Sequence, residues 1–227
     1  RSRPSRLMRS IGSSGSFEGA GSAAVFATSL AVGWAGGVVG AGAALDAATR
    51  GLDTAIVEAR DWASGTSSRS SKLVHGGLRY LEMLDFGLVR EALHERGLLL
   101  RTLAPHLVRP VPFLTGWGWQ RPYIGAGVAL YDGLSRLSFG QATDQAGGLP
   151  LHRHLTRRQA LKLAPSLRRS CLTGAVKYWD ASVDDARLTM SLVRTAAGYG
   201  ALAASRARVI GFLREGERVV GVRVRDL

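Results

Sequence analysis

A glycine-rich turn between two short apolar segments constrains this chain more than any other feature of its sequence. Residues 29–34 are uncharged and predict a buried strand, residues 35–40 (AGGVVG) predict the turn, and a helix is expected from about 40 to 50, ending at Gly51. The next segment, DTAIVEA, predicts a second short strand that ends at Glu58. Together these elements predict a βαβ unit with parallel strands and a covering helix.

The turn matches the G-x-G-x-x-G fingerprint of dinucleotide binding, except that Ala35 stands at the first glycine position. Gly37 and Gly40 take the other two positions, which let the backbone approach a diphosphate and let the helix pack closely on the strand. Glu58 lies 18 residues beyond Gly40, where a carboxylate can accept hydrogen bonds from both hydroxyls of an adenosine ribose. A glycine-rich turn that only packs a helix on a strand is the alternative at this point.

The 27 residues from 19 to 45 carry no charge, which is also long enough for a helix that crosses a bilayer. Seven glycines in that stretch disfavour a membrane helix, because each costs about 1 kcal/mol relative to Ala in a helix interior. Residues 1–28 are expected to be a disordered or atypical lead-in, since residues 1–9 hold four arginines and no acid. A transit peptide is the alternative for that opening.

Charge and cysteine content narrow the class of protein. The 227 residues include 30 Lys and Arg against 17 Asp and Glu, a net charge of +13 that suits phosphate, nucleic acid or an anionic membrane surface. The cations are scattered and aromatic residues make up 7%, so we do not expect a nucleic-acid-binding protein.

Cys171 is the only cysteine, which excludes an intrachain disulfide and fits a reducing, cytoplasmic compartment. The segment His152-Arg153-His154 lacks a third ligand and adjoins further cations, so we expect a solvated basic surface and no metal.

A run of hydroxyl residues leads directly into a basic, glycine-containing segment, and residues 64–82 read SGTSSRSSKLVHGGLRYLE. Alone, the serines would fit a flexible linker, but dense donors beside glycines suit a polyanionic ligand. Together with GAGAALDAATRGLDTAIVEARDWA before it, and with DFGLVREALHERGLLLRTLAPHLVRPVPFL and YWDASVDDARL after it, this segment resembles the FAD-dependent glycerol-3-phosphate dehydrogenases of the respiratory, membrane-associated type. The resemblance extends from about residue 33 to residue 227.

The resemblance implies an α/β fold with a Rossmann-like FAD-binding domain of the glutathione-reductase-like flavoproteins. It implies that this domain occupies residues 29–227 and is incomplete, with the start of a substrate domain within residues 107–180. The implied activity is FAD-dependent oxidation of sn-glycerol 3-phosphate to dihydroxyacetone phosphate, with electrons passed to a quinone by a protein held peripherally at the inner face of a membrane. A catalytically inactive flavin-domain fragment stays open as the alternative.

The resemblance also assigns roles to individual residues. Glu58 would hold the adenosine ribose, with Gly37 and Gly40 in the turn beside it. The pyrophosphate and ribityl chain of FAD would be lined by Ser64, Thr66, Ser67 and Ser71. The segment beneath the isoalloxazine ring would be Lys72, Leu73, Val74 and His75. Arg79 and Tyr80 would face the substrate as the catalytic pair, and the base that removes the hydroxyl proton is not identified.

Periodicity predicts the remaining elements. Apolar residues at helical spacing predict a helix over 85–103, capped by Asp85. Thr156 is expected to start a short helix, and the acidic pair at 184–185 to start another that runs to about Tyr199. From residue 201 onward, alternation predicts strands with a turn at 215–216.

Overall fold

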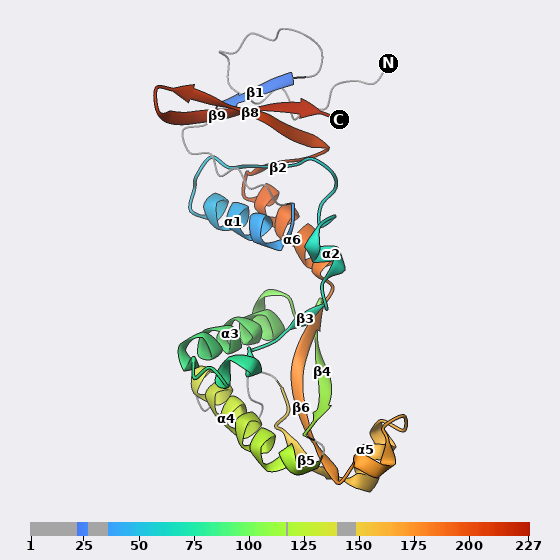
Figure 1. Ribbon diagram of the computed structural model, residues 1–227. Coiled ribbons are helices and arrows are strands. Elements are labelled where there is room, and N and C mark those ends of the chain that lie inside the picture. Colours follow the sequence, from blue (N-terminus) through green and yellow to red (C-terminus); the bar gives the residue numbers. More distant parts are fainter. Residues whose placement is uncertain (1–21, 27–35, 117, 140–148) are drawn as a thin grey trace. The chain divides into compact units, whose positions relative to one another are not determined.

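The computed structural model describes residues 22–26, 36–116, 118–139 and 149–227 (Figure 1). The chain divides into two compact units, unit 1 from Arg1–Ser68 with Thr189–Leu227 and unit 2 from Arg69–Leu188. The expected first strand at 29–34 and the unusual Ala35 lie outside the described residues.

Unit 1 contains the βαβ-type elements that follow the glycine-rich turn. Helix α1 (Val38–Thr49) begins two residues earlier than expected, and strand β2 (Ala55–Glu58) ends at Glu58 as the sequence predicts. β2 pairs in parallel with β7 (Leu202–Ser205), in a register that sets Glu58 opposite Ser205. The first strand after residue 201 therefore adds to the sheet of β2.

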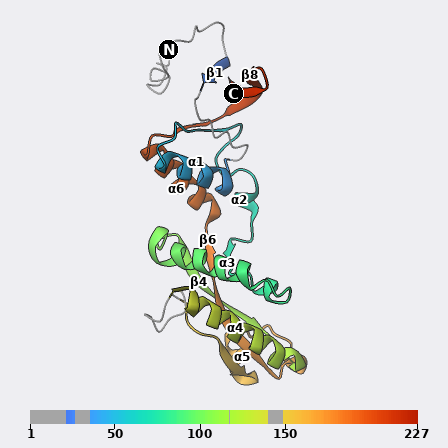
Figure 2. The same ribbon diagram turned by 90° about the vertical axis from the view of Figure 1, so that its left-hand side faces the viewer.

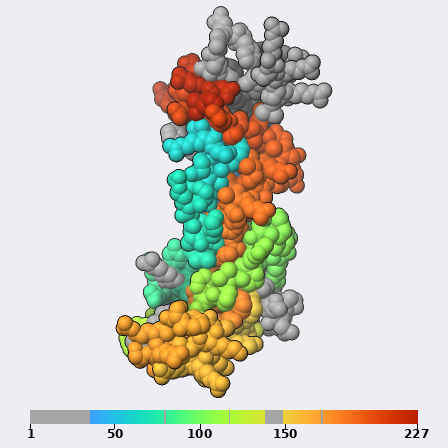
Figure 3. Space-filling model, turned by 90° about the vertical axis from the view of Figure 1, so that its right-hand side faces the viewer, coloured from blue at the N-terminus to red at the C-terminus, as the bar shows by residue number. Residues whose placement is uncertain are grey.

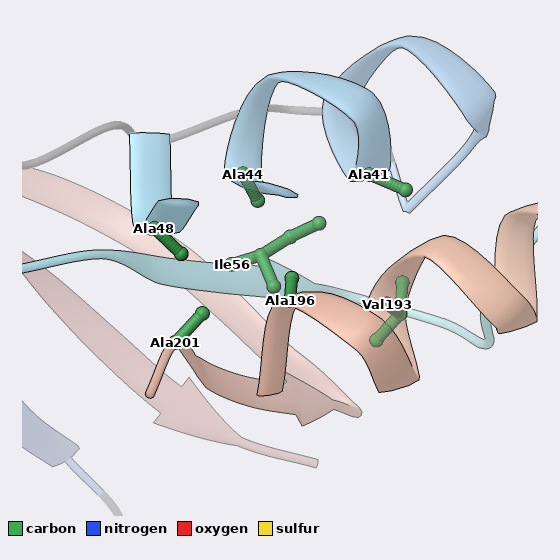
Figure 4. Close-up of a cluster of buried hydrophobic side chains, with 7 residues drawn as sticks. All are labelled: Ala41, Ala44, Ala48, Ile56, Val193, Ala196 and Ala201. Atoms are coloured by element: carbon green, nitrogen blue, oxygen red, sulfur yellow. The ribbon is translucent and has the colours of Figure 1, made fainter. Parts of the chain in front are cut away.

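Small side chains bring the helices of unit 1 close to β2. Helix α6 (Asp185–Gly198) contributes its part from Thr189 onward, and its side chains meet those of α1 around Ile56 (Figure 4). The buried cluster consists of Ala41, Ala44, Ala48, Ile56, Val193, Ala196 and Ala201. Alanine has no atoms beyond Cβ, so α1 can approach the strand closely and present its glycine-rich N-terminus at the end of β2.

An antiparallel ribbon completes unit 1. Strands β8 (Ala207–Glu215) and β9 (Arg218–Asp226) are joined by a turn at Gly216, whose φ of +59° favours glycine. Strand β1 (Ser22–Phe26) pairs with the other edge of β9, which gives the order β1-β9-β8. The hairpin and its turn confirm the alternation seen in the sequence.

Unit 2 is built on a sheet in which β6 (Gly174–Val183) is the central strand. β4 (Val108–Thr115) pairs with it antiparallel along most of its length. β3 (Leu73–Val74) and β5 (Arg153–Thr156) also pair with β6, near its C-terminal and N-terminal ends respectively. The short segment expected to lie under a flavin is thus a strand of this sheet.

Helices α3 (Phe86–Leu98) and α4 (Arg121–Phe139) lie side by side against the sheet of unit 2 (Figures 1 and 2). Asp85 caps α3 through the Leu88 N–H at 3.0 Å, as expected, but the predicted helix changes to a π-helical turn, η3, over Leu99–Leu103. Short 3-10 turns lie at η2 (Leu78–Leu81), η4 (Gly118–Gln120) and η5 (Arg169–Cys171). Of the helices that the structure describes, none combines the length and the apolar character needed to cross a membrane.

The basic segment near residue 152 is only partly the solvated surface that the sequence predicts. Helix α5 (Arg157–Leu163) begins after a capping box formed by Thr156 and Gln159, and its arginines are exposed. The segment around α5 lies at the surface of the face seen in Figure 3. His152 is different, since its Nδ1 lies 2.7 Å from the Asp132 carboxylate and its side chain is 22% exposed. Among the described residues no group of three ligands could hold a metal ion.

The buried hydroxyl of Thr189 is expected to destabilise unit 1. Thr189 is fully buried, and its Oγ1 has no hydrogen-bond partner within the described residues. Thr189→Val keeps the shape and removes the desolvated hydroxyl, so the free energy of unfolding should rise by about 1 kcal/mol. Urea denaturation measures this change.

Thr195→Val is the matched control in the same helix, because the Thr195 hydroxyl is exposed and donates to the Ser191 carbonyl at 2.7 Å. It should leave the stability unchanged or slightly lower. An equal gain in both variants would contradict the explanation.

Candidate functional site

In unit 1 the Glu58 carboxylate joins the glycine-rich turn to the end of β2. The Gly36 N–H donates to Glu58 Oε2 at 2.8 Å, and the Arg60 N–H donates to Oε1 at 2.8 Å. The Gly36 carbonyl in turn accepts from the Ala63 N–H at 2.6 Å. The carboxylate therefore fixes the backbone at the place where the sequence predicts a ribose.

A side chain would collide with its neighbours at Gly36 and would be crowded at Gly37. A Cβ added at Gly36 would lie 2.7 Å from Glu58 Cγ and 2.8 Å from its Oε2. A Cβ at Gly37 would lie 3.2 Å from Ser67 Oγ. Glycine at both positions therefore lets the backbone lie close to Glu58 and Ser67.

The N-terminus of α1 offers donors that its own sequence does not neutralise. Gly37 is the N-cap and supplies no side-chain cap, and the first turn of the helix holds no acidic residue. The partial positive charge of the helix end is therefore available to an anion. The Val38 N–H is satisfied by Ser67 Oγ at 3.1 Å, while Gly40 is buried within the helix.

Three of the hydroxyl residues that follow Ala63 have different environments. Ser67 is buried, and its Oγ accepts the Val38 N–H at the start of α1. Ser64 is half-buried, with its N–H bonded to the Asp61 carbonyl at 3.2 Å. Thr66 is exposed at the start of the short helix α2 (Thr66–Arg69). Only Ser67 of these three is seen to bond to the turn in the described structure.

In unit 2 the segment from Ser70 to Lys72 is tied to the start of α6. The Ser70 hydroxyl bonds to the Asp185 carboxylate, and Lys72 Nζ lies 3.7 Å from Asp184 Oδ1. The Lys72 carbonyl accepts from the Val183 N–H at 2.9 Å. The acidic pair was expected to cap the helix, and Asp184 does accept from the Arg187 N–H at 3.3 Å, yet both carboxylates also hold this segment.

Lys72 has a left-handed backbone with a φ of +58°, which L-residues adopt at a cost of about 1–2 kcal/mol. The tethers around it hold this conformation in place, as is common where a loop serves a site. Ser71 and Lys72 are exposed, and Leu73 and Val74 form β3 beside Ser182 and Ala181. The polar face of this segment is therefore open to a ligand.

Beyond β3 the chain turns at His75, Gly76 and Gly77. The exposed His75 accepts the Gly77 N–H on Nδ1 at 3.2 Å. Tyr80 is 38% exposed on η2, and its N–H bonds to the Gly77 carbonyl at 2.8 Å. The backbone of Arg79 lies in the same 3-10 turn, while its side chain is outside the described part of the structure.

Beneath this turn lies a buried polar network that sequence reasoning missed. Arg96 on α3 donates to Asp180 Oδ1 on β6 at 2.7 Å and to the hydroxyl of Tyr131 on α4 at 2.9 Å. The Gly76 N–H donates to the same hydroxyl at 2.7 Å. The sequence contains one signal of it, the acid at position 180 in the middle of a strand, but no local pattern identifies its partners.

Burial controls the protonation of this network. Desolvation raises the pKa of the Tyr131 hydroxyl far above its ordinary value, so the phenol stays neutral. Burial also raises the pKa of the Asp180 carboxyl, and the Arg96 guanidinium acts in the opposite direction.

Gly36 in unit 1 is also a site residue that the sequence-based assignment did not include, although it stands inside the glycine fingerprint.

Comparison with known proteins agrees with a dinucleotide site. The sequence model of the family described as FAD dependent oxidoreductase matches residues 32–226. A glycerol-3-phosphate dehydrogenase of Mycobacterium leprae is 61% identical over 194 residues, 84% of this chain and 32% of the relative. A mitochondrial glycerol-3-phosphate dehydrogenase of Rattus norvegicus is 43% identical over 208 residues, 85% of this chain and 27% of the relative. The chain thus spans about a third or less of the length of these curated relatives.

Solved structures give the same fold. A glycerol-3-phosphate dehydrogenase from Bacillus halodurans complexed with FAD superposes with a TM-score of 0.58 at 31% identity, covering 87% of this chain and 30% of that one. L-proline dehydrogenase from P. horikoshii superposes with a TM-score of 0.59 at 20% identity over 85% of this chain and 47% of that one, a likeness of fold alone. The predicted α/β, Rossmann-like fold of an FAD-binding domain is confirmed.

Gly36→Ala should disrupt the contact between the turn and Glu58. The added Cβ would force the Glu58 side chain away and weaken its bond to the turn, so we expect unit 1 to lose on the order of 1–3 kcal/mol in the free energy of unfolding. Gly42→Ala in α1 is the control, because a Cβ there meets nothing within 4 Å. It should gain up to about 1 kcal/mol. Equal changes in the two variants, measured by urea denaturation, would show that the turn is not constrained as described.

Proposed function

Because this chain belongs to the FAD dependent oxidoreductase family, we propose that it binds FAD and takes part in the oxidation of sn-glycerol 3-phosphate. The observation that carries the choice of substrate is the 61% identity with a mycobacterial glycerol-3-phosphate dehydrogenase. The cofactor is that of the family, and its fit can be judged from the residues of each unit.

The residues of unit 1 fit the adenosine diphosphate portion of FAD. A carboxylate has about four acceptor positions, so Glu58 can bond to the ribose hydroxyls while it holds the Gly36 and Arg60 amides. Gly37 and the N-terminus of α1 would face the diphosphate, with Ser64, Thr66 and Ser67 supplying hydroxyl donors beside it. Gly40 would allow the helix to pack beneath.

The residues of unit 2 fit the flavin end and one wall of a substrate site. We assign Ser71 to the ribityl chain and the segment Lys72–His75 to the position beneath the isoalloxazine ring. When bound, FAD supplies the acceptor for the hydride that leaves C2 of the substrate. The positive charge of Lys72 would stabilise the reduced form of FAD. Arg79 would bind the substrate phosphate through its planar fork, and Tyr80 would line the cavity.

We also propose a reaction product, an electron acceptor and a cellular location for the protein. Removal of hydride from C2 and a proton from its hydroxyl gives dihydroxyacetone phosphate, and a quinone would take the electrons. The net charge of +13 supports peripheral association with an anionic membrane surface on the cytoplasmic side. We propose residues 29–227 as the FAD-binding oxidoreductase domain, residues 1–28 as a lead-in, and substrate-domain elements within 107–180.

The test is a titration of the purified chain with FAD, followed by anaerobic addition of sn-glycerol 3-phosphate. Flavin absorbance that survives desalting supports FAD binding, and its bleaching by sn-glycerol 3-phosphate supports the substrate. Glycerol and sn-glycerol 1-phosphate are the controls and should leave the absorbance unchanged. FAD binding without bleaching would favour the alternative of an inactive flavin-binding domain, and failure to bind FAD would exclude both.

Glu58→Gln tests the ribose contact. The amide oxygen can still accept the Gly36 N–H, but the charge-assisted bonds to the ribose are lost. FAD binding should weaken by about 1–3 kcal/mol, roughly fivefold to 150-fold in Kd. Glu217→Gln, an exposed change in the β8–β9 turn, is the control for loss of one charge and should bind FAD like the parent. An unchanged Kd for Glu58→Gln would remove the assignment.

A further inference from the structure

We propose that Arg96, Tyr131 and Asp180 are positioning residues that hold the His75–Gly77 backbone in the conformation required beside the flavin. The inference rests on the proposed function, because that function places the segment Lys72–His75 against FAD. None of the three side chains needs to touch the cofactor. They act through the Gly76 amide, which stands between β3 and η2.

Neighbouring groups occupy every hydrogen-bonding position of the Tyr131 hydroxyl. It accepts from the Gly76 N–H at 2.7 Å and from Arg96 at 2.9 Å, and it lies 3.3 Å from each oxygen of Asp180, to which it can donate. A phenol has one donor and two acceptor positions. Each is therefore occupied, which fixes both the rotation of the hydroxyl and the position of the Gly76 amide.

The charged pair makes this arrangement rigid. Arg96 is 2% exposed and Asp180 is 4% exposed, and they meet at 2.7 Å. Ser135 adds a bond to the other guanidinium nitrogen of Arg96 at 3.3 Å. Replacing a buried ion pair with apolar groups is often neutral or stabilising, so stability alone does not explain why charge is buried here. Its effect is to define one geometry for three elements, α3, α4 and β6.

The loop itself can adopt only a narrow range of conformations. A Cβ added at Gly76 would collide with the side chains of Leu93 and Tyr131, and Gly77 has a φ of +75°. The Gly77 carbonyl accepts from the Tyr80 N–H at 2.8 Å. A shift of the Gly76 amide is therefore passed to Tyr80 on one side.

On the other side, the same shift is passed to β3. Val74 pairs with Ala181, which adjoins Asp180 in β6. The network thus lies directly under the junction between the proposed flavin segment and the proposed substrate wall. Loss of the Tyr131 hydroxyl should move both at once.

Tyr131→Phe is the test, made in the FAD-loaded full chain. The ring volume is kept, but the Gly76 N–H loses its acceptor. We expect FAD binding to weaken about tenfold, the visible circular dichroism of the flavin to change, and the Gly76 amide to exchange hydrogen faster. Tyr178→Phe is the control on β6 itself, where the ring stacks on Phe113 with centroids 5.4 Å apart, and it should match the parent in all three measurements.

Ser135→Ala keeps the test decisive if Tyr131→Phe does not fold. It removes the longest bond to Arg96 and leaves the Tyr131 hydroxyl in place, so it should change the flavin spectrum and Gly76 exchange in the same direction by a smaller amount. A parent that binds FAD, with Tyr131→Phe or Ser135→Ala indistinguishable from it, overturns this inference and leaves the proposed function standing. Equal effects of Tyr131→Phe and Tyr178→Phe overturn it as well. A parent that does not bind FAD overturns the proposed function, and this inference falls with it.

Discussion

The carboxylate of Asp180, buried in the central strand of unit 2, is the constraint on which that unit depends. A buried carboxylate requires partners, and here they come from both helices that cover the sheet, as Arg96 on α3 and Tyr131 on α4. Apolar packing among Leu81, Val89, Leu93 and Tyr131 brings the same helices together without fixing their register. The polar contacts fix the register of the two helices, and through the Tyr131 hydroxyl they also fix the position of the loop at Gly76.

Unit 1 uses a carboxylate in a comparable way. Glu58 ends β2 and accepts hydrogen bonds from two backbone amides, those of Gly36 in the glycine-rich turn and of Arg60. In both units an acidic side chain on a strand helps to fix the backbone of a buried glycine, directly at Gly36 and through the Tyr131 hydroxyl at Gly76. Burial differs between them, because Glu58 lies near solvent and Asp180 does not.

Local chemistry explains how much of this could be predicted from the sequence. The α1–β2 segment, the Asp85 cap, the Thr156 capping box and the final hairpin follow from short-range spacing and turn residues. The polar network does not, because its members at 76, 96, 131 and 180 are far apart in the chain and only the sheet brings them together. The double role of the 184–185 pair was missed for the same reason.

The alanine-lined core of unit 1 has an energetic consequence. Alanine loses no rotamer freedom on burial, so the contact of α1 and α6 with β2 is ordered at little entropic cost, but it buries little apolar area for each residue. A ligand that binds only the native state adds to the stability that this core supplies. By mass action, a ligand present at 100 times its Kd adds about 2.7 kcal/mol, more than most single core side chains contribute. The abundance of folded unit 1 in a cell would then follow the supply of its dinucleotide.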